Sequence, residues 1–274
     1  LRNLETRLQR EPLEGQIGIG HTRWATHGKP TESNAHPHAT DRLAVVHNGI
    51  IENFRELREE LQKKGAKFGS ETDTEVAAHL VHENLKQGMD LLEAVRRAVA
   101  RFQGAYALLV FDSKDPDRII VTRIASPLVI GLGIGENFVA SGVPALLPVT
   151  QRFIYLEQGD VAEITRDGVK IFDPQGNPVT RAVHETQWSQ EAAEKGPYRH
   201  FMLKEIFEQP VSVENTMRGR LILEDGNAKL GGINLSHEQL LNIDNVIITA
   251  CGTSWHSALI GEMMIEELCR IPVE

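Results

Sequence analysis

The sequence predicts an α+β protein followed by the beginning of an α/β segment. Three observations support this fold class. Apolar residues recur at helical spacing in residues 53–102, short apolar runs separated by turns follow from Gly104, and an isolated apolar strand pattern occupies residues 245–250. Helices grouped before a series of strands are typical of α+β layers. A length of 274 residues suffices for one large core and part of another.

The helical part begins with residues 1–14, a polar segment that is expected to contain the end of a helix. Three further helices are expected in residues 53–65, 72–85 and 90–102. Each begins with a side chain that can accept a hydrogen bond from a free N–H of the first helical turn. These starting residues are Asn53, Thr72 with Glu75 in a capping-box pattern, and Asp90 with Glu93.

Short strands make up the rest of the first domain, which is expected to end at residue 180. Two of them, residues 17–21 and 43–47, are expected to lead into polar segments. Because turn residues separate the later strands at short spacing, we expect antiparallel pairing. These later strands are expected at residues 105–111, 118–124, 128–132, 137–140, 153–156, 161–165 and 169–172.

A second domain is expected in residues 198–274. Residues 181–197 contain glycine, proline and acidic residues and are expected to form a linker. Residues 198–218 then predict a long amphipathic helix. Further on, the apolar run 245–250 predicts a strand that leads into a Cys-Gly-Thr-Ser turn and another helix, which is the start of an α/β unit.

The composition argues against several classes of partner. A formal net charge of −9 without a long basic block argues against nucleic acid. No apolar run approaches the roughly 18 residues that span a bilayer, and no signal peptide opens the chain, so no membrane association is expected. The two cysteines, Cys251 and Cys269, form no disulfide framework, which favours a reducing, cytoplasmic location.

Three polar segments stand out in the first half of the chain. They are GHTRWATHG at residues 20–28, HNG at 47–49 and SETDTE at 70–75. Such polar groups need partners if they are buried, so an ordinary strand does not account for them. Arg23 can bind a carboxylate, Asp73 can bind an ammonium group, and a glycine turn offers free N–H groups. Together they could bind a zwitterionic amino acid.

The three segments resemble the glutamine-binding half of class II glutamine amidotransferases, the N-terminal nucleophile group. The resemblance implies a four-layer αββα sandwich and a nucleophilic cysteine whose own α-amino group is the base. It implies that Arg23 binds the α-carboxylate of L-glutamine and Asp73 its α-ammonium group. Asn48 and Gly49 would form the oxyanion hole. The residues that would wall the pocket are Trp24, Thr26 and His27.

Each of these residues also has a plainer interpretation. Arg23 can be a surface residue of a strand, and Asp73 can cap the helix that follows it. Asn48 and Gly49 can form a turn at the end of a strand, because Asn-Gly is a common turn sequence.

Two other motifs suggest different chemistry. Five histidines lie between His21 and His47, which raises the alternative of a metal site. Histidine ligands are usually spaced along a helix or joined by cysteines, and these are not, so no metal is expected. The GLGIG segment at residues 131–135 resembles a dinucleotide loop, but it lies between strands and is expected to be structural. The family resemblance implies no cofactor.

The C-terminal part resembles a narrower group. Residues 198–210, YRHFMLKEIFEQP, resemble the hinge between the glutaminase and sugar isomerase (SIS) domains of isomerising amidotransferases that act on a sugar phosphate. The resemblance implies D-fructose 6-phosphate as the nitrogen acceptor and a homodimer for the complete protein. A strand, a turn and a helix N-terminus together can bind phosphate, so four residues of this turn are expected to contact the sugar phosphate. They are Cys251, Gly252, Thr253 and Ser254.

The sequence departs from the family pattern in two places. The family's catalytic cysteine precedes the GHTRWATHG segment by tens of residues, but residues 1–19 contain no cysteine, so we expect an inactive fragment that also lacks most of the isomerase domains. Gly142 stands where the family typically has an acidic residue. Two other functions stay open: the glutaminase domain of another class II amidotransferase, such as the phosphoribosyl-pyrophosphate type, and a non-catalytic glutamine-binding module.

Overall fold

The computed structural model describes residues 2–23, 27–186, 195–222, 226–228 and 235–274. The chain divides into two compact units, Leu1–Gly196 and Pro197–Glu274, and each is described here by itself. Within the described ranges, none of the helices combines the length and the apolar character that crossing a bilayer requires.

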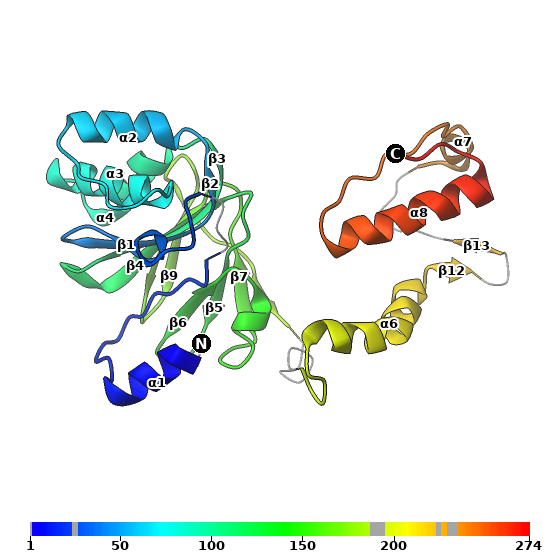
Figure 1. Cartoon of the computed structure of the whole chain (residues 1–274), viewed down its shortest axis with the longest axis horizontal. Coiled ribbons are helices and arrows are strands. Elements are labelled where there is room, and N and C mark those ends of the chain that lie inside the picture. Colours follow the sequence, from blue (N-terminus) through cyan, green and yellow to red (C-terminus); the bar gives the residue numbers. More distant parts are fainter. Residues whose placement is uncertain (1, 24–26, 187–194, 223–225, 229–234) are drawn as a thin grey trace. The chain divides into compact units, whose positions relative to one another are not determined.

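A seven-stranded antiparallel sheet forms the centre of the first unit (Figure 1). Its order is β1-β2-β3-β4-β8-β9-β10, so neighbours in sequence mostly pair with each other. The strands are β1 (His38–Ala39), β2 (Leu43–Ile51), β3 (Gly104–Asp112), β4 (Asp115–Ile124), β8 (Val161–Thr165), β9 (Val169–Phe172) and β10 (Pro178–Val179).

A second antiparallel sheet packs against the first. Its strands, in spatial order, are β11 (Val183–Glu185), β7 (Arg152–Tyr155), β5 (Val129–Leu132) and β6 (Asn137–Ala140). Apolar side chains of both sheets, among them Val121, Ile130 and Ile164, form a shared core. All seven strands expected after residue 104 are present, and their antiparallel pairing is confirmed.

Three helices cover the other face of the seven-stranded sheet (Figure 1). They are α2 (Phe54–Lys63), α3 (Thr74–Lys86) and α4 (Leu91–Val99). Their apolar faces bury Leu61, Val76 and Val95 against β2, β3 and β4 in the largest core. The three expected helices are therefore confirmed. The polar segment near the N-terminus is also helical, as α1 (Arg2–Arg10).

The four-layer αββα sandwich is seen in part. In the described residues the layers are the three helices, the seven-stranded sheet and the four-stranded sheet. On the outer face of the four-stranded sheet lie the 3-10 helix η2 (Val143–Ala145) and Leu146, which pack against Val129 and Phe153. A short irregular segment thus supplies the apolar contacts that a helical layer would otherwise supply.

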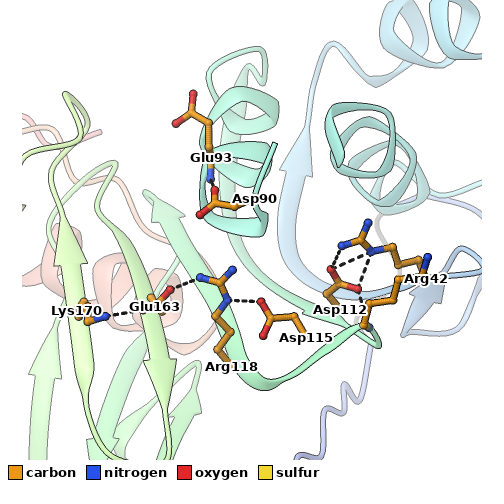
Figure 2. A network of polar contacts seen from close by, with 9 residues as sticks. Arg42, Asp90, Glu93, Asp112, Asp115, Arg118, Glu163 and Lys170 are labelled. Atoms are coloured by element: carbon orange, nitrogen blue, oxygen red, sulfur yellow. Dashed lines mark hydrogen bonds and ion pairs between the residues drawn. The ribbon is translucent and has the colours of Figure 1, made fainter. Parts of the chain in front are cut away.

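Several local expectations were wrong. Residues 17–21 form no strand, and two glycines in this segment favour irregular backbone. The capping box of Thr72 and Glu75 is absent, because the helix begins only at Thr74. The Glu75 carboxylate instead accepts hydrogen bonds from the N–H groups of Gly69 and Ser70, at 2.7 and 2.8 Å. By contrast, Asp90 does cap α4, since its side chain accepts from the Glu93 N–H at 2.8 Å (Figure 2).

Ion pairs connect the turn regions of the first sheet (Figure 2). Arg42 contacts both oxygens of the fully buried Asp112, with a shortest distance of 2.6 Å. Arg118 joins Asp115 and Glu163, and Lys170 contacts Glu163 from the next strand at 3.2 Å. These contacts link the loop before β2, the β3–β4 turn, β4, β8 and β9.

The expected linker at residues 181–197 also needs correction. Residues 183–185 form β11, which pairs with β7, and Arg181 bonds the buried Asp160 at 2.8 Å. The sheet therefore continues past residue 180, since these residues have partners in the first unit. Residues 187–194 lie outside the described residues.

The second unit contains α6 (Phe201–Met217), β12 (Leu221–Ile222), β13 (Asn227–Ala228), α7 (His237–Leu241) and α8 (Thr253–Cys269). The long helix expected over 198–218 is confirmed as α6. The strand expected at 245–250 is reduced to a parallel bridge between Val246 and Val273, with a bond from Ile248 N–H to the Glu274 carbonyl at 2.7 Å. This single bridge pairs too few residues to make a regular strand of residues 245–250.

Candidate active site

A cavity of about 340 Å³ lies where the end of β2 meets the start of α3. The expected glutamine-site residues that line it are Arg23, His27, Asn48, Gly49 and Asp73. The structure thus brings together residues from all three polar segments of the sequence. Trp24 and Thr26, which were expected to wall the pocket, lie outside the described residues.

Gly49 lies inside β2, where its backbone conformation requires glycine. Its φ is +130°, and a Cβ at this position would lie 2.1 Å from the Ala105 carbonyl oxygen. The pairing of β2 with β3 continues through Asn48 and Gly49 to Ile51. The interpretation of Asn48 and Gly49 as a chain-reversing turn is therefore wrong.

The N–H of Gly49 faces the open edge of β2. The N–H of His47 bonds His36 Nδ1 at 3.3 Å, and the N–H of Ile51 bonds Asp73 Oδ2 at 2.8 Å, so both point away from β3. Since successive N–H groups of a strand point to alternate sides, Gly49 between them directs its N–H to this same edge. The exposed Asn48 next to it also lines the cavity.

Asp73 does not cap α3. It occupies the N-cap position, but its side chain makes no capping hydrogen bond. Its side chain is only 5% exposed, and its carboxylate accepts a hydrogen bond from Ile51 N–H. Its oxygens lie 4.0 Å from His27 Nδ1 and 3.9 Å from His47 Nδ1. A buried carboxylate at a cavity wall can bind an ammonium group, because one neutral hydrogen bond leaves most of its charge unpaired.

Arg23 contacts its own loop. Its guanidinium donates to the carbonyl oxygens of His27 at 2.7 Å, Gly28 at 3.2 Å and Lys29 at 2.8 Å. Its φ of +53° is uncommon for a residue with a side chain. The loop therefore holds Arg23 at the cavity wall by backbone contacts, and carbonyl oxygens leave its positive charge uncompensated.

A set of histidines that was not predicted as part of the site surrounds these residues. His21 stacks on His36 with ring centroids 4.4 Å apart, and His38 contacts His36 edge-on at 5.0 Å. Burial, and then the charges of neighbouring imidazoles and Arg23, lower the pKa of His36 to about 3. The clustering of histidines in the sequence was the available signal, but it was weighed only as a metal site. Among the described residues, no group of three or more His, Cys, Asp or Glu could hold a metal ion.

Thr74 connects His36 with His47. Its hydroxyl lies 2.9 Å from His47 Nδ1 and 3.4 Å from His36 Nε2. Burial lowers the pKa of His47 to about 4, although the neighbouring Asp73 acts in the opposite direction. The lining of the cavity thus includes the guanidinium of Arg23, the carboxylates of the buried Asp73 and the exposed Glu52, and the imidazoles of His36 and His47, which burial keeps uncharged near neutral pH.

The residues expected at a sugar phosphate lie in the second unit. Thr253 begins α8, and Gly252 before it has a φ of +61°. Cys251, Gly252, Thr253 and Ser254 are all exposed.

The structure explains one of two further glycine positions noted in the sequence. The GLGIG segment lies on β5 and in the turn to β6, where a Cβ on Gly131 would lie 2.7 Å from Thr150 Cγ2. Close packing therefore explains a glycine there. Gly142 has extended backbone with room for a side chain, and nothing in the structure explains why it is glycine.

Known proteins resemble this chain at the level of sequence. Residues 21–148 match the glutamine amidotransferase domain family. The glutamine–fructose-6-phosphate aminotransferase [isomerizing] of Idiomarina loihiensis is 53% identical over 272 residues, which are 99% of this chain and 44% of the relative. That of Escherichia coli K12 is 51% identical over 267 residues, which are 97% of this chain and 44% of the relative. That of Thermus thermophilus is 52% identical over 265 residues, which are 96% of this chain and 43% of the relative.

The chain thus spans less than half the length of these relatives. Among solved structures, a glutamine phosphoribosylpyrophosphate amidotransferase from B. subtilis, complexed with ADP and GMP, is similar with a TM-score of 0.48. It is 28% identical in sequence, and the match covers 58% of this chain and 35% of that one.

Proposed function

Because this chain is a homologue of the glutamine–fructose-6-phosphate aminotransferases over nearly its whole length, we propose that it forms the glutamine-binding part of such an enzyme. The enzyme transfers the amide nitrogen of glutamine to D-fructose 6-phosphate and forms glucosamine 6-phosphate. The chain itself supplies the site at which glutamine is bound and its amide is opened.

The observation that carries this proposal is the combination of charges and donors in one cavity. Arg23 offers an uncompensated cation for the α-carboxylate, and Asp73 offers a buried carboxylate for the α-ammonium group. Glutamine is a zwitterion whose side chain ends in an amide, so a site for it needs both charges and a donor pair near the amide oxygen. Asn48 and Gly49 are that donor pair.

The reaction at this site is acyl transfer. A thiolate attacks the amide carbon of glutamine, and the amide oxygen becomes an oxyanion. The side-chain N–H of Asn48 and the backbone N–H of Gly49 stabilise this oxyanion. The α-amino group of the nucleophilic cysteine, which has taken the proton of the thiol, passes it to the amide nitrogen as the C–N bond breaks. Ammonia leaves, and water hydrolyses the thioester that remains. Residues 1–250 contain no cysteine, so the first unit provides binding and oxyanion stabilisation without providing the thiol.

The proposal extends to the acceptor. The exposed start of α8, with Thr253 and Ser254, is where the phosphate of fructose 6-phosphate binds, since helix N-terminal N–H groups favour phosphate. A helical fourth layer over the four-stranded sheet and the assembly of two complete subunits are further parts of the proposal, which the family resemblance supports.

Calorimetric titration of the 274-residue chain with L-glutamine tests the proposal. We expect saturable binding of L-glutamine, weaker binding after Arg23→Gln, and no hydrolysis. Absence of binding by the folded chain contradicts the proposed site, and glutamine hydrolysis by this chain alone contradicts the need for a thiol from elsewhere. A second experiment joins a segment with an N-terminal cysteine to residue 1, and ammonia release that Arg23→Gln abolishes is then expected.

A further inference from the structure

His36, Thr74 and His47 form a closed series of hydrogen bonds beside the cavity. The backbone N–H of His47 donates to His36 Nδ1 at 3.3 Å. The other nitrogen of that ring, Nε2, lies 3.4 Å from the Thr74 hydroxyl, and the hydroxyl lies 2.9 Å from His47 Nδ1. The series therefore begins at the backbone of His47 and returns to its side chain.

The position of each proton follows from the first of these bonds. Because His36 Nδ1 accepts from a backbone N–H, it holds a lone pair, and the neutral ring carries its proton on Nε2. This Nε2–H donates to the Thr74 oxygen. The buried Thr74 hydroxyl must then donate its own hydrogen, and His47 Nδ1 is the acceptor within reach. His47 accepts at Nδ1 and consequently holds its proton on Nε2.

Both rings are neutral near pH 7. Burial lowers the pKa of His36 to about 3 and the pKa of His47 to about 4. The charged and titratable groups around His47 are the carboxylate of Asp73, which raises its pKa, and the imidazoles of His21, His27 and His38, which lower it. The uncharged forms that the hydrogen-bond series requires are therefore the forms present.

The Nε2–H group of His47 has no partner in the part of the chain that the structure describes. Its side chain is almost completely buried, and Nε2 makes no hydrogen bond there. A buried donor without an acceptor is costly, and such groups in native proteins are few. His47 is also a wall residue of the cavity. A bound ligand with an acceptor oxygen would satisfy this donor.

We propose that Thr74 holds His47 in the Nε2–H tautomer and that this N–H donates to the α-carboxylate of the bound amino acid. The identity of the ligand rests on the proposed function. His47 Nδ1 lies 3.9 Å from Asp73 Oδ2, and Asp73 binds the ammonium group in that proposal. The ammonium and carboxylate groups of an α-amino acid share one carbon, so the carboxylate lies next to Asp73, within the reach of His47. Thr74 and His36 are positioning residues, which act through His47.

Nitrogen NMR of the 274-residue chain with ¹⁵N-labelled histidine tests the tautomer. Long-range ¹H–¹⁵N correlations distinguish a protonated Nε2 from a protonated Nδ1 in each ring. We expect a protonated Nε2 in His47 of the wild type and of Thr74→Ser, which keeps the hydroxyl. In Thr74→Val, which has the same shape without the hydroxyl, we expect a mixture of tautomers and about tenfold weaker binding of L-glutamine. A wild-type His47 that is protonated at Nδ1, or at both nitrogens at pH 7, overturns the proposal, and this measurement does not depend on the variants.

Titration with L-glutamine in the same spectra tests the ligand contact. We expect the His47 Nε2–H proton to move downfield and to exchange more slowly with water. An unchanged His47 signal, while the amide signal of Gly49 responds to glutamine, overturns the contact and leaves the proposed function intact. If no signal of the cavity responds, the proposed function fails together with the contact, while the free-protein spectrum still decides the tautomer.

Discussion

Asp73→Asn removes one charge from the cavity with little change in shape. The Asp73 side chain is nearly isosteric with asparagine, whose side-chain oxygen can still accept the Ile51 N–H that Asp73 now accepts at 2.8 Å. The fold is therefore expected to persist. The Asp73 side chain is only 5% exposed, so water screens its charge poorly.

The size of the effect follows from the bond that is lost. A hydrogen bond between an ammonium group and a buried carboxylate contributes roughly 1.5–3 kcal/mol. At about 1.4 kcal/mol for each factor of ten, Asp73→Asn weakens L-glutamine binding by about 10-fold to 150-fold. Because the first unit has no thiol, glutamine is not consumed, and calorimetry measures the binding equilibrium directly.

Glu52→Gln is the matched control. Glu52 also lines the cavity, but it is exposed, so the same loss of charge is screened by water. We expect less than about a threefold change in affinity from this variant. Equal losses in the two variants would refute the direct contact and indicate a general effect of negative charge, and unchanged affinity in Asp73→Asn would exclude Asp73 as the ammonium site.

Three further predictions concern the fold. Gly49→Ala should lower the free energy of unfolding by about 2–5 kcal/mol, since the new Cβ would lie 2.1 Å from a carbonyl oxygen. Gly65 also has a positive φ but has open space around it, so Gly65→Ala should lower the same free energy by only about 1 kcal/mol. Urea unfolding of both variants measures the difference. Arg42→Ala should lower the free energy of unfolding by about 3 kcal/mol at pH 7, because it leaves the buried Asp112 carboxylate unpaired. The value is at the lower end for a buried ion pair because the Arg42 side chain is 28% exposed. Burial raises the pKa of Asp112, but hydrogen bonds from Arg42 and Lys114 lower it below its usual value. The stabilisation by this ion pair is therefore complete above about pH 4 and is lost as the pH falls through the lowered pKa. A difference in unfolding free energy between wild type and variant that stays constant down to about pH 2 would contradict this. Amides of α8, which buries no side chain, should exchange hydrogen at least about 100-fold faster than those of β3, and equal protection would contradict it.

The positions of the elements were largely predictable from the sequence. Alternating apolar residues and turns located the strands after residue 104, and their short connections favoured antiparallel pairing. The division into two sheets was not predictable in this way, because β4 pairs with β8 and β5 with β7, which are not neighbours in sequence. Helix starts were less predictable. Asp90 caps α4 as expected, but Asn53 bonds Arg101 and Gln103 instead of its helix, since tertiary partners compete for the same side-chain oxygen.

The residues of the candidate site were predicted by type, but their arrangement was not. An Asn-Gly pair alone indicates a turn, and only the paired strand β3 beside it extends β2 through Gly49. The histidines were visible in the sequence, but their hydrogen-bond order was not. It depends on Thr74 reaching His36 and His47 across 38 and 27 residues of sequence, respectively, which no local pattern records.

The cavity lies along the edge of β2 that the short strand β1 leaves uncovered. His38 and Ala39 pair only with Val45 and Ala44, so the edge of β2 beyond Val45 has no strand neighbour in the described chain. A strand edge with free N–H groups is normally a liability for folding. Here His36 takes one N–H of this edge and Asp73 takes another, and the N–H of Gly49 between them faces the cavity. His36, Asp73 and the N–H of Gly49 therefore both occupy the edge of the sheet and form part of the site. A shift in the register of β2 would displace all three groups, and we expect it to abolish binding.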